Sequence, residues 1–191
     1  MKVKDLLKDS AELLGLTKQV EILSSETADE TEILLDAEIA SLFNLFKFSV
    51  RELCTNYIPV SVIENISTRE GKYPISSFSN YVKLVKVTKN NEKVAYKILN
   101  RNLVFESDGS YDVEYCTYPE ITTISQEIDF LTVFNADVLV DGLCAYYSIS
   151  KGMFEEFESF HENYKVKAES IRAMKTFVMP QRRWQWKQKN V

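Results

Sequence analysis

The chain is poor in the residues on which most familiar catalytic and metal-binding motifs depend. Its 191 residues include one histidine, three cysteines and five glycines. The glycines form neither a G-x-x-x-x-G-K nor a G-x-G-x-x-G loop, which argues against the two common glycine-rich phosphate-binding motifs. One histidine and three scattered cysteines do not supply the closely spaced ligands of a zinc site. We therefore expect a protein that is not an enzyme, with no catalytic residues, no metal and no cofactor.

The three cysteines, Cys54, Cys116 and Cys144, are an odd number and contain no C-x-x-C pair. This pattern favours buried, small apolar groups in a reducing compartment over a disulfide framework. A reactive thiol is the alternative. A nucleophilic cysteine usually has a histidine nearby, and His161 is the sole histidine of the chain.

Long hydrophobic runs are missing too. The most apolar stretch, Ala40 to Val50, is short and is interrupted by Asn44 and Lys47, whereas a membrane-spanning helix needs ~20 predominantly apolar residues. The first residues of the chain lack the continuous apolar segment of a secretory signal. We therefore expect no membrane partner, and synthesis as a soluble protein.

Helical spacing of apolar residues dominates both ends of the chain. It predicts helices over about 1–15, 32–57, 134–150 and 153–176. The last two are joined by a short turn ending in Gly152 and should pack antiparallel. The second should be long and central, because apolar residues recur in it every three or four positions: Leu35, Ile39, Leu42, Phe46, Val50, Leu53 and Tyr57.

The middle of the chain changes to the alternating pattern of strands. Between Pro59 and Pro119 the sequence predicts about four to six short antiparallel strands. "PVSVIENIS" (59–67) is one candidate strand, and hairpins are expected at "KNNE" (89–92) and at Asp108-Gly109. The predicted fold class is α+β: a helical bundle, made of a long central helix plus a C-terminal helical hairpin, with a small antiparallel β-sheet inserted and an extended C-terminal tail. We assign residues 1–178 to a single domain and 179–191 to the tail.

The tail, "MPQRRWQWKQKNV", is unlike the rest of the chain. It holds both tryptophans and four cations but no acid, in a protein of net charge −5. Arginine and tryptophan are the residues most enriched at interface hot spots. Such a strip could add to a sheet edge, lie in a neighbour's groove, contact the acidic helix of an identical neighbour, or fold back on its own helices. We predict partner-binding residues in the tail: Arg182, Arg183, Trp184, Trp186 and Lys187.

Two alternatives stay open. The basic tail could bind nucleic acid, since its four cations could neutralise about four phosphates. The segment Phe154 to Glu162 concentrates carboxylates, with Glu158 and His161 at the E-x-x-H spacing of di-iron bundles. Because the second copy of that motif is missing, a solvated acidic face is favoured over a metal site or an unrecognised enzyme.

Several stretches, taken in order, resemble a known protein family. These are "RELCTNYIPV" (51–60), "VEYCTYPEI" (113–121), "SQEIDF" (125–130), "DGLCAYYSISKGMFEEFESFHENYK" (141–165) and "MPQRRW" (179–184). Together they resemble the head-to-tail connector (adaptor) proteins of tailed bacteriophages and prophages, above all those of gut phages. The resemblance covers about Glu32 to Trp184 and includes no catalytic fingerprint.

The resemblance implies a structural virion protein. Connectors form a homo-oligomeric ring, commonly dodecameric, below the portal protein, where the ring extends the DNA channel and joins the capsid to tail proteins. The partners implied are thus other copies of the chain, the portal, tail proteins, and genomic DNA that passes without specific binding. The implied location is the portal vertex of the virion, and the host cytoplasm during assembly. Arg182, Arg183 and Trp184 would be docking residues. Some of the many acidic side chains would face the channel and repel DNA phosphate.

Overall fold

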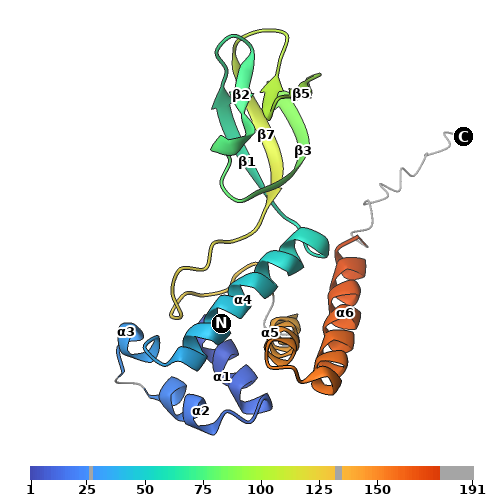
Figure 1. The fold of residues 1–191 in the computed structure, drawn as a ribbon. Coiled ribbons are helices and arrows are strands. Elements are labelled where there is room, and N and C mark those ends of the chain that lie inside the picture. The colour runs from blue at the N-terminus through green and yellow to red at the C-terminus, as the bar shows by residue number, and fades with distance from the viewer. Residues whose placement is uncertain (26–27, 132–134, 177–191) are drawn as a thin grey trace, which may run out of the picture.

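The computed structural model describes residues 1–25, 28–131 and 135–176, and its fold is α+β as predicted. Figure 1 shows a helical lobe from which a β-module projects. The helices of the described chain are α1 (Val3–Leu13), α2 (Thr17–Ser24), α3 (Glu30–Ile33), α4 (Ala37–Asn56), α5 (Asp137–Ser150) and α6 (Phe154–Thr176). None of these helices is long and apolar enough to cross a membrane.

The predicted N-terminal helix and C-terminal helical hairpin are confirmed. Gly15 follows α1 with a φ of 69°, and Gly152 lies between α5 and α6 with a φ of 74°. Both values are in the left-handed region that glycine adopts without a steric cost, so these residues end the helices as expected. The sequence pattern did not predict α2.

The predicted helix over 32–57 is wrong at its beginning. Asp36 accepts hydrogen bonds from the backbone amides of Glu38 (3.0 Å) and Ile39 (3.2 Å), so its carboxylate caps a helix that begins at Ala37. Asp29 caps the separate single-turn helix α3 by accepting from the amide of Glu30. Leu35, expected in the core, lies between the two helices and is 83% exposed.

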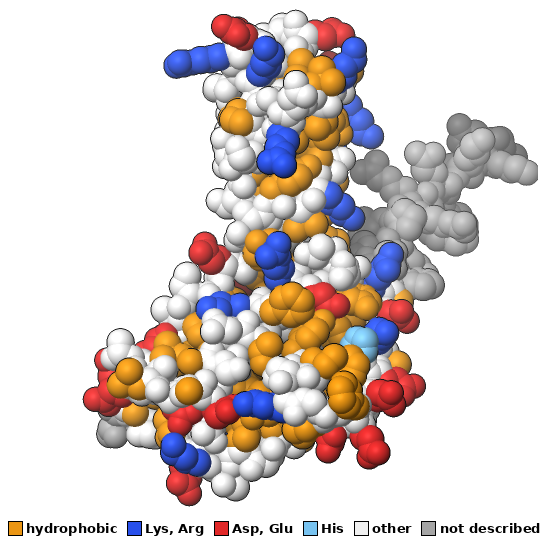
Figure 2. Space-filling model, in the orientation of Figure 1, with side chains coloured by type: hydrophobic (Ala, Val, Ile, Leu, Met, Phe, Trp, Pro, Cys, Tyr) orange, Lys and Arg blue, Asp and Glu red, His pale blue; other side chains and the backbone are white. Residues whose placement is uncertain are grey.

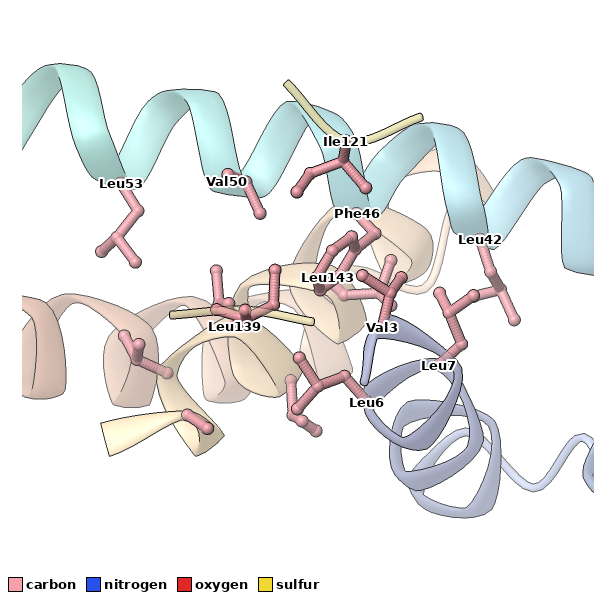
Figure 3. Packing of buried hydrophobic residues seen from close by; sticks show 14 of the residues in the cluster. Val3, Leu6, Leu7, Leu42, Phe46, Val50, Leu53, Ile121, Leu139 and Leu143 are labelled. Atoms are coloured by element: carbon pink, nitrogen blue, oxygen red, sulfur yellow. The ribbon is translucent and has the colours of Figure 1, made fainter. Parts of the chain in front are cut away.

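The core of the helical lobe forms where α1, α4, α5 and α6 meet. Five of the seven predicted core positions of the long helix are buried there: Ile39, Leu42, Phe46, Val50 and Leu53. Figure 3 shows four of them, Leu42, Phe46, Val50 and Leu53, on the side of α4 that faces the other helices of the core. Their neighbours there include Leu139 and Leu143 of α5 and Val3, Leu6 and Leu7 of α1. Burying each such side chain contributes on the order of 1.5–3 kcal/mol relative to leaving it exposed.

A connecting segment without regular structure completes this core. Residues 119–131 run from the β-module back to the start of the chain. The amides of Val3 and Lys4 donate to the carbonyls of Gln126 and Ile124, and the amide of Ile128 donates to that of Met1. Four apolar side chains of the segment are buried in the helical core: Ile121, Ile124, Ile128 and Leu131.

The β-module contains two antiparallel sheets. The larger has the strand order β1-β7-β3-β4, and the smaller β2-β6-β5. The seven described strands, one more than the upper expected number, are β1 (Val60–Ser67), β2 (Lys72–Pro74), β3 (Tyr81–Lys89), β4 (Glu92–Lys93), β5 (Lys97–Leu99), β6 (Asn102–Val104) and β7 (Ser110–Thr117). The module has a hydrophobic cluster of its own, which includes Ile66, Val87, Leu103, Phe105 and Val113.

One of the two predicted hairpins is confirmed and the other is wrong. Asn90 and Asn91 have φ values of 53° and 65° and join β3 to β4, as "KNNE" predicts. Asp108-Gly109 does not close a hairpin, because β6 and β7 belong to different sheets. Instead, the Asp108 carboxylate accepts a hydrogen bond of 2.6 Å from the amide of Gly71, which links the connection between β6 and β7 to the connection between β1 and β2.

The two hydrophobic clusters are separate, one in each lobe. The chain passes between the lobes twice, after α4 and after β7 (Figure 1). The assignment of 1–178 to a single domain stays a prediction, as does the separate role of the tail.

Candidate functional site

All five predicted partner-binding residues lie outside the described residues: Arg182, Arg183, Trp184, Trp186 and Lys187. The binding prediction for the tail therefore stays a prediction. The described chain ends at Thr176, the last residue of α6. In Figure 1 this end of α6 lies near the end of α4, on the side of the helical lobe that carries the β-module. The last described residue, Thr176, therefore lies on the side of the helical lobe that carries the module.

The clearest open surface of the β-module is the outer edge of β1. This strand has eight residues and pairs along its full length with β7, while no strand of the described chain pairs with its other side. Alternate residues of an edge strand direct their amide and carbonyl groups outward. Val62 is 36% exposed and Ile63 is 67% exposed. The β1 edge therefore offers both backbone groups and apolar side chains to a partner.

The other sheet edges of the described chain carry the features that usually prevent such pairing. On the far side of the larger sheet, β3 has irregular pairing at two places and β4 has two residues, both charged. In the smaller sheet, β2 contains Pro74 and β5 has three residues including Lys97. Bulges, proline, lysine and short length are known protections of exposed edges. Between Val60 and Ser67 there is no lysine or proline, and Glu64 is the one charged residue.

The two faces of the sheet beside this edge differ chemically. On the face toward the smaller sheet, Val62 lies opposite Tyr115 and Ile66 opposite the buried Tyr111. On the outer face, Ile63 lies opposite Glu114, and Asn65 lies opposite Asp112 and donates to its carboxylate at 2.8 Å. A strand that added to β1 would therefore meet one mainly apolar face, on which Glu64 is the one charged residue of β1. Its other face would meet uncharged residues of β1, with Asp112 and Glu114 one strand further in.

Where α4, α5 and α6 meet, a partly buried cluster of tyrosines surrounds one carboxylate. Glu52 of α4 accepts hydrogen bonds at Oε2 from the hydroxyls of Tyr146 (2.6 Å) and Tyr164 (2.7 Å). Burial is the larger cause that raises the pKa of both tyrosines, and the hydrogen bond to the Glu52 carboxylate is the next. Each tyrosine therefore remains a neutral hydrogen-bond donor. The hydroxyls of Tyr111, Tyr115 and Tyr147 also have acceptors. All five of these tyrosine hydroxyls are therefore satisfied by acceptors within the described chain.

A hollow of about 600 Å³ lies next to this cluster, between α4 and the segment that follows β7. Its walls include Lys47, Phe48 and Arg51 of α4. The Arg51 guanidinium lies 5.2 Å from the ring centre of Tyr118. Phe48 is 52% exposed and contacts Tyr146 edge to face at 4.8 Å between centroids. Two cations beside exposed aromatic carbon are suited to a protein contact, and the sequence patterns did not identify them.

The acidic face of α6 agrees with its sequence interpretation. Glu155, Glu158 and Glu162 are exposed, as a solvated acidic face requires. The ring of His161 stacks on Phe157 at 4.9 Å. Burial, together with the charge of Lys165, lowers the pKa of His161. In Figure 2, acidic side chains gather around the helical lobe, whereas basic ones predominate over the visible face of the β-module.

The cysteines are buried, as predicted, and none is in a disulfide. Burial raises the pKa of Cys144 to about 12. A thiol with such a pKa supplies almost no thiolate at neutral pH, which argues against its use as a nucleophile. The reducing compartment stays a prediction.

No protein-family model matches the chain, and no curated protein matches it either. The function must therefore be argued from the surfaces described above.

Proposed function

We propose that this protein is a head-to-tail connector of a tailed bacteriophage, a structural subunit that forms a ring below the portal and extends the DNA channel. The proposal combines the resemblance of residues 32–184 to connectors with one observation on the fold. A β-module with an unprotected β1 edge projects from a separately packed helical lobe. Such a shape provides a helical body for the ring and a projecting module that can reach a neighbouring subunit or the portal.

The charge distribution supports the same proposal. The exposed carboxylates of α6 include Glu155, Glu156, Glu158 and Glu162. A surface of this kind repels DNA phosphate, which suits a channel through which the genome moves without binding. The basic tail is of opposite sign, so unlike surfaces of neighbouring copies attract each other. Contacts between unlike surfaces of identical subunits are the kind that close rings.

The proposal is tested by measuring the mass of the purified full chain, by light scattering and electron microscopy. The measurement is made alone and in a mixture with the portal protein encoded in the same genome. We expect rings, or assembly on the portal. The control is the chain that ends at Met179, which should keep its circular dichroism spectrum and lose portal binding. A full chain that stays monomeric in both samples would contradict the proposal.

The same preparation tests nucleic-acid binding through the tail. Four phosphate contacts predict a slope of about −3 to −4 for the logarithm of affinity against the logarithm of salt concentration on duplex DNA. Binding with that slope, lost with the tail and without ring formation, would favour the nucleic-acid-binding alternative.

A further inference from the structure

The structure points to a specific binding site for the C-terminal tail. We propose that residues 182–189 of one copy add as a strand to the β1 edge of a second copy. The inference rests on the proposed function in assuming that copies of the chain associate, and it names the contact through which they do so. The described chain supplies the edge, and the sequence supplies a segment whose pattern matches it.

The first argument is the state of the edge. β1 has eight residues, which span about 27 Å at ~3.4 Å per residue. Every other sheet edge of the described chain is short, irregular, or carries lysine or proline, as shown above. Soluble proteins rarely leave a long edge without such protection, because it invites pairing with another chain. An edge without protection is therefore expected to have an occupant.

The second argument is the match between the two faces of the edge and the two faces of the tail. In an extended strand successive side chains point to opposite faces. One face of residues 182–189 then carries Arg182, Trp184, Trp186 and Gln188, and the other carries Arg183, Gln185, Lys187 and Lys189. The tryptophan face suits the apolar side of β1, where Val62 is partly exposed. The cationic face suits the outer side, where Asp112 and Glu114 lie one strand further in.

The acids of the outer face already have partners, and both acids are partly exposed. Lys86 pairs with Glu114 at 3.0 Å, and Asn65 donates to Asp112. The ammonium group of Lys86 belongs to a side chain that is 47% exposed. Carboxylates in such pairs accept further hydrogen bonds from an added arginine or lysine, since each oxygen has two lone pairs.

The third argument concerns which copy supplies the tail. In Figure 1 the end of α6 and strand β1 lie on opposite sides of the base of the β-module, with β3 between them in the view. To return to β1 of its own subunit, the tail would have to pass around the base of the module, whereas exchange between neighbours sets no such requirement. In such an exchange each subunit binds one neighbour through its tail, and its own β1 edge binds the tail of the other neighbour. This is a head-to-tail contact, which closes into a ring when the rotation between subunits permits.

The test uses the tryptophans as a built-in reporter, because the chain has two and both are in the tail. Their fluorescence emission therefore reports the surroundings of the tail alone. For the full chain we expect the emission to shift to shorter wavelength as concentration and mass rise together. Ile63→Lys places a cation on the exposed outer side of β1 and should weaken association roughly tenfold or more, because like charges then meet at the contact.

A matched control separates the edge from a general effect of charge. Ile98→Lys makes the same substitution on β5, at a side chain that is 53% exposed, and should leave the association unchanged. Ser61→Lys, on the same side of β1 as Ile63, is the second variant if Ile63→Lys alters the circular dichroism spectrum. Finally, the chain ending at Met179 has the edge without a tail, whereas Ile63→Lys has the tail without a usable edge. The shortened chain should not associate alone, and Ile63→Lys should associate alone only at about tenfold higher concentration or more. Below that concentration, mixing the two should restore the emission shift.

Two results would overturn the inference. In the first, Ile63→Lys and Ser61→Lys associate as strongly as the unchanged chain. In the second, the emission stays shifted in a monomer at high dilution, which would mean that the tail folds on its own subunit. Rings that form, or a portal that binds, without any effect of the β1 variants would reject this contact and leave the proposed function standing. A chain that neither associates nor binds portal would reject both.

Discussion

The tyrosine cluster between α4, α5 and α6 provides a stringent test of the described packing. Glu52→Ala removes the acceptor of two hydroxyls, those of Tyr146 and Tyr164. Tyr164 is fully buried. An unsatisfied buried polar group costs about 1–3 kcal/mol. Because Tyr146 is half-buried and can reach water, we expect the free energy of unfolding to fall by about 2–4 kcal/mol in total.

The assay is urea unfolding followed by far-ultraviolet circular dichroism. Glu52→Gln keeps one acceptor oxygen and should cost less than Glu52→Ala. Glu38→Ala is the matched control, since Glu38 accepts from Tyr147 in a similar way but its side chain is 36% exposed. In a double-mutant cycle, Glu52→Ala and Tyr164→Phe should be non-additive, because they share one hydrogen bond. Additive effects, or a loss below about 0.5 kcal/mol for Glu52→Ala, would refute the reasoning.

Three further predictions address other parts of the fold. Gly142→Ala should lower the free energy of unfolding by about 1–3 kcal/mol in the same assay, because the added Cβ would overlap Ser49 Oγ and approach the Tyr164 ring to 3.0 Å. Asp9→Asn should raise stability at neutral pH: burial and nearby acids raise the pKa of Asp9, so its ionisation above the ordinary pKa of 3.8 disfavours the native state. That gain should be full above the raised pKa and vanish below 3.8, and unchanged stability at pH 7 would contradict it. Alkylation of Cys144 should require unfolding, whereas rapid labelling of the native protein, detected by mass spectrometry, would contradict its described burial.

The sequence predicted those features of the fold that depend on local patterns. The core positions of α4, the Gly152 turn and the Asn90-Asn91 hairpin follow from apolar period or from turn chemistry. The beginning of α4 was misplaced because apolar spacing continues through Leu35, whereas the Asp36 cap decides where the helix starts.

Features that depend on long-range pairing were beyond these patterns. Asp108-Gly109 has the residues of a tight hairpin, yet the strands around it enter different sheets. The turn that does join β5 and β6 is formed by Asn100 and Arg101, with φ values of 49° and 61°. An arginine in the left-handed region is not a common turn signal, so the division into two sheets could not be inferred from local chemistry.

The candidate site likewise has one part that the sequence predicted and other parts that only the structure revealed. The composition of the tail drew attention to residues 182–187, but composition does not reveal what a tail binds. The receiving edge became visible once the order of the strands was known, because "VSVIENIS" predicts a strand and not its place at the edge of a sheet. The hollow beside Lys47, Phe48 and Arg51 likewise depends on a segment distant in sequence.

The central claim is that the tail of one subunit binds another subunit in a ring. Electron microscopy of the assembled full chain, at a resolution that traces the backbone, tests it most directly. We expect a closed ring in which residues 182–189 of each subunit pair with β1 of its neighbour. A map in which the tail packs on its own subunit, in a particle that does not associate, would contradict the account.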